Sequence, residues 1–262
     1  MTEDDRQYSL EQAQVRSQQD LLVFDQFVVR ELDGEMWLTI EVNGVPVTRL
    51  ACMDSALKEL AAGWAFMHRF CVHPHDFGSA TSHGERAAVM VTGGIDIDRH
   101  LAELTGALTP RPTLPEPFPR DEPWSIPHDV LLDILREAWT LFRKDRMAEG
   151  SVHAALASVS GIEVVAFDII PENAFAKVLG WALQDGRMPT HEIVIINGLV
   201  TRGMVEAASR VGVLIIATPF VPTADAYRAA RIAGMSIVGY MRQRTVGVFH
   251  DTGLINFESV ES

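Results

Sequence analysis

Residues 191–219, HEIVIINGLVTRGMVEAASRVGVLIIATP, contain two short apolar segments on either side of a helical pattern. The segments HEIVIIN and VGVLIIATP are apolar throughout, which is typical of strands buried on both faces of a sheet. Residues 201–210 between them predict a helix, with Thr201 at the position of its N-cap. Strand, helix and strand in this order predict two parallel strands of an α/β sheet.

The same alternation extends over the second half of the chain. We expect further strands at 163–168 and 236–241, helices at 171–184 and 223–233, and a last strand near 245–250. A helical pattern at 128–143 begins this half. Residues 128–262 therefore predict an α/β domain whose mainly parallel sheet is covered by helices on both faces.

Residues 20–127 predict a smaller, mostly antiparallel β-containing region. Alternating segments follow one another there, and the pairs Asp33-Gly34 and Asn43-Gly44 separate them. Such pairs are the strongest short-range hairpin signal, so we expect an antiparallel meander.

Three other segments of this half have their own patterns. Residues 1–19 are polar and without period, so they predict a loose tail. A helix is expected at 54–70, with Asp54 as its N-cap. Residues 109–127 contain seven prolines, which predicts an extended loop.

Charge and hydropathy exclude several classes of function. The net charge is −13, and residues 1–149 hold 14 Lys and Arg against 25 Asp and Glu. A chain this acidic is not expected to bind nucleic acid through a non-specific basic surface. Its apolar runs are too short for a membrane span, and its acidic start lacks the features of a signal peptide, so we expect a cytoplasmic protein.

The chain has two cysteines, Cys52 and Cys71, one at each end of the expected helix at 54–70. They form no Cys-x-x-Cys pattern, and we expect buried, unpaired and inert thiols. Arg49 and Arg69 are the cations near them in sequence. Neither a metal-binding set of ligands nor a glycine-rich nucleotide fingerprint is found.

Polar residues gather where the predicted strands end. Ligands of open α/β sheets bind beyond the carboxyl ends of the strands, where helix N-termini offer free N–H groups. Each such residue has a structural alternative: Thr201 and Thr223 suit N-caps, Gly198 suits a tight turn, and Arg242 suits a solvated edge. Several corners at one edge together favour a site, and the candidate residues are Asp168, Asn173, Lys177, Asn197, Gly198, Thr201, Pro222, Thr223 and Arg242.

One of these corners carries a recognisable motif. FDIIPENAFAKVLG, residues 167–180, is similar to the signature Glu-Asp-Val-Gly-Arg-His-Asn-Ala-x-Asp-Lys, of which Asp168, Asn173, Ala174 and Lys177 match. Phe167 stands in the place of its Glu. On this motif the chain resembles the formate dehydrogenase accessory sulfurtransferase family.

Further segments carry the same resemblance from the Asn43-Gly44 turn onward. EGSVHAA, residues 149–155, looks like the family's Thr-Gly-Gly-x-His element, with Gly150 and His153 retained. NGLVTRGMVEAA keeps Gly198 of the next motif, and Leu199 replaces its Arg. The segment that begins VPTADAY retains Pro222, Thr223 and Arg242 of a third motif. The resemblance implies a three-layer, cytidine deaminase-like arrangement for the C-terminal α/β domain.

The resemblance also implies a function. Family members pass sulfur from a cysteine desulfurase to the molybdenum guanine dinucleotide cofactor of formate dehydrogenase through a Cys-x-x-Cys pair. The corresponding segment here, residues 102–127, contains no cysteine. We therefore expect a formate dehydrogenase accessory protein that binds or presents this cofactor, or weakly binds a guanine nucleotide, without the cysteine relay, with no catalytic residue and no directly bound metal ion.

Two alternatives stay open from the sequence. One is a non-catalytic binding or regulatory module that kept the fold, and the other is a sulfurtransferase that uses Cys52 or Cys71. The partners implied by the resemblance are formate dehydrogenase, a cysteine desulfurase and a second copy of the chain in a homodimer. For a bound nucleotide, we expect Lys177 and Arg242 to supply charge and Asp168 to accept from the base or ribose.

Overall fold

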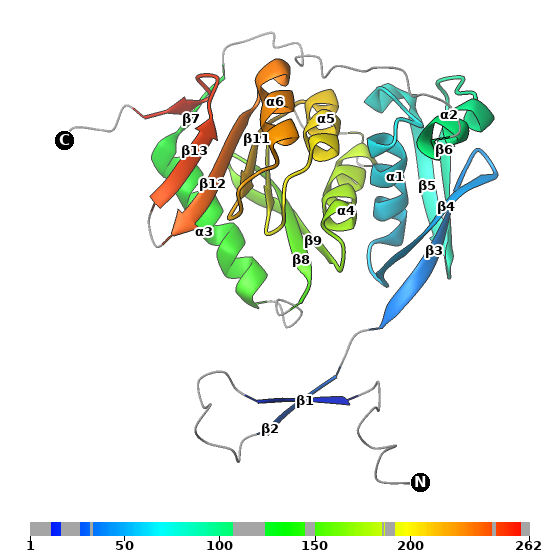
Figure 1. Cartoon of the computed structure of the whole chain (residues 1–262), viewed down its shortest axis with the longest axis horizontal. Coiled ribbons are helices and arrows are strands. Elements are labelled where there is room, and N and C mark those ends of the chain that lie inside the picture. Colours follow the sequence, from blue (N-terminus) through cyan, green and yellow to red (C-terminus); the bar gives the residue numbers. More distant parts are fainter. Residues whose placement is uncertain are drawn as a thin grey trace.

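A computed structural model of the chain describes residues 12–16, 27–31, 34–106, 124–144, 150–184, 186, 192–242 and 245–257. A six-stranded and a four-stranded sheet, two smaller two-stranded sheets, and the helices between and around them make up this part of the chain (Figure 1). The larger sheet has six strands in the order β13-β12-β11-β10-β8-β9. Its strands are β8 (Val152–Ser158), β9 (Gly161–Asp168), β10 (Glu192–Ile196), β11 (Val213–Thr218), β12 (Ser236–Arg242) and β13 (Thr245–His250).

Only the centre of the six-stranded sheet is parallel. Strand β11 pairs in parallel with β10 and with β12, whereas β8, β9 and β13 join by antiparallel pairing. The prediction of a mainly parallel sheet is corrected to this extent. The reason is that a two-residue turn joins β8 to β9, and so short a connection can link only antiparallel neighbours.

Helices cover both faces of this sheet, which confirms the predicted α/β architecture. Helix α3 (His128–Lys144) packs on one face, while α4 (Pro171–Gln184), α5 (Arg202–Val211) and α6 (Ala224–Ala233) lie on the other (Figure 1). Along β10, Ile193 and Ile195 belong to the core with α3, and Val194 and Ile196 belong to the opposite core. A short parallel pair, β7 (Ile126–Pro127) and β14 (Ile255–Asn256), extends the core beside α3.

The smaller sheet has four strands in the order β4-β3-β6-β5. They are β3 (Glu35–Val42), β4 (Val45–Met53), β5 (Phe77–His83) and β6 (Arg86–Val91). The Asn43-Gly44 hairpin is confirmed: both residues have positive φ, 49° and 82°, as a two-residue hairpin turn requires.

The predicted meander is wrong at its first step. The second neighbour of β3 is β6, in parallel, while β2 (Phe27–Glu31) pairs with β1 (Gln12–Arg16) in a sheet of their own. Strand β1 lies within the predicted polar tail; its regularity comes from backbone hydrogen bonds to β2, to which side-chain polarity is no barrier. The predicted proline-rich loop, 109–127, lies mostly outside the described residues.

Helix α1 (Leu57–Met67) follows β4, and its N-cap residue is Ala56 at φ 49°, not the predicted Asp54. Asp54 is part of a bend three residues before the helix, so its side chain cannot reach the first turn as a cap would. A 3₁₀ turn (Pro74–Asp76) and α2 (Ile97–Leu104), which Asp96 caps, complete this region.

Helix α1 lies between the small sheet and α4, where two glycines permit a very close approach (Figure 1). A Cβ atom on Gly63 would overlap the carbonyl oxygen of Ala176, and one on Gly180 would overlap that of Glu59. One continuous core therefore includes side chains of both sheets, such as Leu38 of β3 and Val194 of β10.

The glycine contact predicts a sharp difference between two helical glycines. Gly63→Ala forces a methyl group into the α4 backbone, and we expect the free energy of unfolding to fall by about 3 kcal/mol or more. Gly203→Ala, on α5, has open space around the added methyl group and is expected to raise it by up to about 1 kcal/mol. Urea denaturation of both variants measures the difference, and equal effects would contradict the close helix contact.

Candidate functional site

The carboxyl ends of β9, β10, β11 and β12 lie at one edge of the six-stranded sheet. Strands β10, β11 and β12 are mutually parallel, and β9 points the same way as β10 because both are antiparallel to the intervening β8. The corners selected from the sequence are thus brought to one side of the molecule.

The first corner holds a buried ion pair. The Nζ atom of Lys177 lies 2.7 Å from Oδ2 of Asp168, and both side chains are 0% exposed. Asn173 donates from Nδ2 to Oδ1 of Asp168 at 3.0 Å. Three residues of the family-like motif are therefore bonded to one another inside the protein.

The same three side chains bind the end of β4. Met53 donates its backbone N–H to Asp168 Oδ2 at 3.3 Å, Asn173 Nδ2 donates to the carbonyl of Ala51 at 2.9 Å, and Lys177 Nζ donates to Ser55 Oγ at 3.1 Å. Such hydrogen bonds offset part of the free-energy cost of removing the charged pair from water. The partners are 115 to 122 residues away in sequence, and no local pattern could have indicated them.

His153, the retained histidine of the family-like element, is fully buried beside this corner. Its ring lies between those of Phe142 on α3 and Phe167 on β9, with centroid distances of 5.3 and 5.9 Å. Phe167 is also its cross-strand partner, and the Lys177 Nζ lies 5.8 Å from the Phe167 ring. A row of rings thus connects α3 to the ion pair.

The second and third corners are bonded to each other. Asn197 accepts from the backbone N–H of His153 at 2.5 Å through Oδ1, and Thr218 donates from Oγ1 to the carbonyl of Gly198 at 2.7 Å. A Cβ atom on Gly198 would lie 3.1 Å from side-chain atoms of Pro171 and Val152. Asn197 and Gly198 therefore close the end of β10 by packing and hydrogen bonds.

The helix starts differ from one another. Thr223 caps α6 by accepting from the N–H of Ala226 at 3.0 Å, whereas Thr201, at the N-cap of α5, makes no capping hydrogen bond. Pro222 is buried in front of α6. Arg242 ends β12, and its side chain lies outside the described residues.

An apolar surface, formed by Leu199, Phe220 and Val221, lies on the two loops that precede α5 and α6. These side chains are 46%, 50% and 60% exposed. The loops are joined by the Thr218–Gly198 bond and by the N–H of Thr223, which donates to the carbonyl of Val200 at 3.2 Å. The sequence analysis did not select these residues, because single apolar residues in loops carry no signal.

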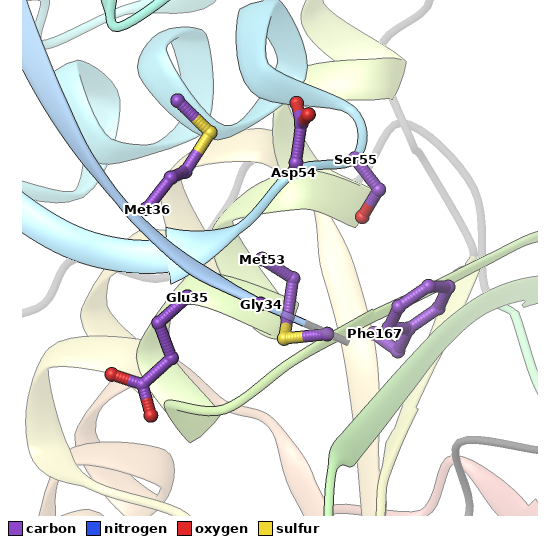
Figure 2. Close-up of a pocket in the computed structure, with 7 residues that line it drawn as sticks. All are labelled: Gly34, Glu35, Met36, Met53, Asp54, Ser55 and Phe167. Carbon is purple, nitrogen blue, oxygen red and sulfur yellow. The ribbon is translucent and has the colours of Figure 1, made fainter. Parts of the chain in front are cut away.

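A cleft of about 450 Å³ lies next to the residues that bind the buried ion pair, Met53 and Ser55 (Figure 2). It is at the open end of the β3–β4 hairpin, against β9, and its lining residues are Gly34, Glu35, Met36, Met53, Asp54, Ser55 and Phe167. Phe167 is the only one of them within the family-like motif. Clefts at the junction of two structural units are frequent ligand sites.

Both cysteines are buried, as predicted, and neither forms a disulfide. Burial raises the pKa of the Cys52 thiol to about 11 and that of Cys71 to about 12. Their cationic neighbours are Lys177 and Arg210, which lower these pKa values less than burial raises them. The sequence-adjacent Arg49 and Arg69 are not the relevant cations, because the opposite half of the chain packs against both thiols.

The described residues contain neither a membrane-spanning helix nor a cluster of metal ligands. No helix among them is long and apolar enough to cross a membrane. Over the same residues, no group of three or more His, Cys, Asp and Glu side chains is placed to hold a metal ion. Binding of a cofactor by the nine predicted residues stays a prediction.

The fold is an α/β fold that the chain shares with a solved structure, that of a protein from Desulfotalea psychrophila assigned as a formate dehydrogenase accessory protein. That structure superposes with a TM-score of 0.71 at 21% identity, covering 88% of this chain and 93% of the neighbour. The FdhD/NarQ family matches residues 34–256, and the chain belongs to this family.

Curated relatives in the family share the name sulfur carrier protein FdhD. The protein from Nocardia farcinica is 37% identical over 127 residues, which cover 46% of this chain and 44% of that protein. The protein from Mycobacterium tuberculosis is 25% identical over 258 residues, covering 86% of this chain and 92% of the relative. The protein from Geobacillus kaustophilus is 25% identical over 237 residues, covering 86% and 90%.

Breaking the buried ion pair should destabilise the whole protein. Lys177→Met leaves the Asp168 carboxylate buried without its cation, and we expect a loss of about 3–5 kcal/mol in the free energy of unfolding. Asp168→Asn combined with Lys177→Met should recover part of this loss. As a control, Arg228→Ala removes an exposed partner of Asp225 and should cost less than about 1 kcal/mol. Urea denaturation of the set measures these effects; a Lys177→Met loss as small as the control would contradict the structural role.

Proposed function

We propose that this chain is an accessory protein of formate dehydrogenase that binds or presents the molybdenum guanine dinucleotide cofactor without relaying sulfur through its own cysteines. The observation that carries this proposal is the burial of both thiols in a chain that belongs to the FdhD/NarQ family. The names of the relatives support the association with formate dehydrogenase and sulfur handling.

A persulfide forms on a thiolate that a donor can reach. With pKa values of about 11 and 12, the thiolate fraction at neutral pH is about one in ten thousand or less. Cys52 is 0% exposed and Cys71 is 2% exposed, so neither sulfur meets solvent. These two properties disfavour the alternative in which Cys52 or Cys71 carries sulfur.

The start of α5 supports a weak nucleotide site at the carboxyl edge. The hydroxyl of Thr201 makes no hydrogen bond to the first N–H groups of α5. Uncapped N–H groups at the start of a helix bind phosphate. The apolar surface of Leu199, Phe220 and Val221 beside it offers a face for a flat ring. When bound, the cofactor supplies molybdenum and its dithiolene sulfur; the chain supplies orientation and shielding from water.

Two parts of the structure do not fit a phosphate group. Among the residues that the structure describes, those lining the cleft of Figure 2 include the acidic Glu35 and Asp54 and no Lys or Arg. The Asp168–Lys177 pair is buried and already bonded, so in this proposal it holds the edge in place and does not touch the ligand. The roles first expected of these two side chains are revised accordingly.

The partners in this proposal are those that the family implies. Formate dehydrogenase receives the cofactor, a cysteine desulfurase docks without passing sulfur to this chain, and the chain forms a homodimer. Retention of the fold without the family's Cys-x-x-Cys pair supports a presenting role.

A cysteine-free variant tests the absence of a relay. We expect Cys52→Ala combined with Cys71→Ala to support as much formate dehydrogenase activity as the unaltered chain, in a host that lacks its own accessory protein. Mass spectrometry after incubation with a desulfurase and cysteine should show no persulfide on the unaltered chain. Loss of activity in a variant that circular dichroism shows to be folded would contradict the proposal.

Restoring a family residue tests the nucleotide site. Leu199→Arg places a cation at the start of α5, and we expect its affinity for guanosine diphosphate to rise about tenfold or more in calorimetric titration. Val159→Arg is the matched control, since Val159 is 51% exposed in the β8–β9 turn at the opposite edge. Equal affinities for both variants, or no binding by either, would favour a module that has kept the fold without the cofactor.

A further inference from the structure

The cleft at the open end of the β3–β4 hairpin combines apolar and acidic groups. Met36, Met53 and Phe167 are its apolar lining residues. Figure 2 shows the Met53 side chain pointing toward Phe167, while the carboxylates of Glu35 and Asp54 point outward from this pair. A ligand that enters this cleft would contact apolar side chains within it and would have the two carboxylates around it.

The two carboxylates are not neutralised within the part of the chain that the structure describes. Glu35 and Asp54 are exposed and have no ion-pair or hydrogen-bond partner there. The nearby Lys177 does not offset them, because its charge is balanced by Asp168 and its Nζ donates to Ser55. The cleft therefore has a negative charge that a ligand can balance.

Apolar walls with flanking carboxylates suit a long cationic side chain. The methylene groups of arginine or lysine pack on thioethers and aromatic rings, and a guanidinium group also stacks on a ring face. The electrostatic field of the chain also favours a cationic ligand. The net charge is −13, and residues 1–149, which supply most of the cleft, hold 25 acidic against 14 basic residues. Such a field speeds the association of basic partners.

We infer that this cleft is a docking site for an arginine side chain on a basic segment of a partner protein. Gly34, Glu35 and Asp54 of its lining are exposed, so a side chain can enter from solvent while the partner's backbone stays outside. The inference goes beyond the proposed cofactor role and does not depend on it.

Methionine methyl NMR provides a direct test on the whole chain. The protein is labelled with ¹³C in its methionine methyl groups, the signals of Met36 and Met53 are assigned by Met→Leu variants, and N-acetyl-Gly-Arg-Gly-amide is added to about 10 mM. We expect the Met36 and Met53 signals to shift with saturation. The signal of Met90, 51% exposed on β6 and not part of the cleft, should not move.

Charge variants of the protein and a neutral peptide test whether binding depends on opposite charges. Asp54→Asn should weaken binding of the arginine peptide about fivefold, the size expected for one partly solvated ion pair. Asp98→Asn is the matched control: Asp98 is an exposed acid of the same half, on α2 and away from the start of β3, and its loss should change nothing (Figure 1). A glutamine peptide of the same length should leave Met36 and Met53 unshifted.

Three results of the peptide titrations would overturn the inference. They are the absence of any shift with the arginine peptide, equal shifts with the glutamine peptide, and affinity unchanged by Asp54→Asn. Shifts of Met36 and Met53 with guanosine diphosphate in place of the arginine peptide would also overturn it, since an anion would then occupy the cleft. The proposed nucleotide site is tested separately at Leu199, so failure of one proposal is distinct from failure of the other.

Discussion

The buried ion pair of Asp168 and Lys177 is the interaction on which the rest of the structure depends. Two charges removed from water cost several kcal/mol unless their remaining hydrogen-bonding groups find partners. Here those partners include the N–H of Met53 and the hydroxyl of Ser55, both at the end of β4. The corner between β9 and α4 is therefore satisfied only when the small sheet docks on it.

The contact between α1 and α4 follows from the same docking. Once β4 ends at the ion pair, α1 starts beside α4, and Gly63 and Gly180 let the two backbones come together without side chains between them. The small sheet thereby shares one core with the six-stranded sheet. The cleft of Figure 2 is lined by residues around the start of β3, the end of β4 and the end of β9, so elements of both sheets hold it.

The residues of this chain that match the family's motif at 167–177 are buried. The family-like Asp168, Asn173 and Lys177 are retained, and the structure uses them to join two sheets. In the motifs that carry the resemblance, Leu199 stands in the place of an Arg, and the chain contains no Cys-x-x-Cys pair. An architecture maintained by internal bonds while its exposed chemistry changes is consistent with the proposed presenting role.

Local sequence was sufficient to predict most of the helices and strands of the α/β half and the Asn43-Gly44 hairpin, because periodicity and turn chemistry act between neighbouring residues. Strands β8 and β14 were not predicted. Helix α4 begins and ends where its pattern predicts, at residues 171 and 184. The sequence also indicated the polar corner at Asp168, because a polar residue there follows an apolar strand. What tertiary structure alone decided is the pairing of β3 with β6, the partners of Asp168 and Lys177, and the cationic neighbours of the two thiols. These arise between residues as far apart in the chain as Arg210 and Cys71, which are 139 positions apart, and they depend on packing geometry that no local pattern encodes.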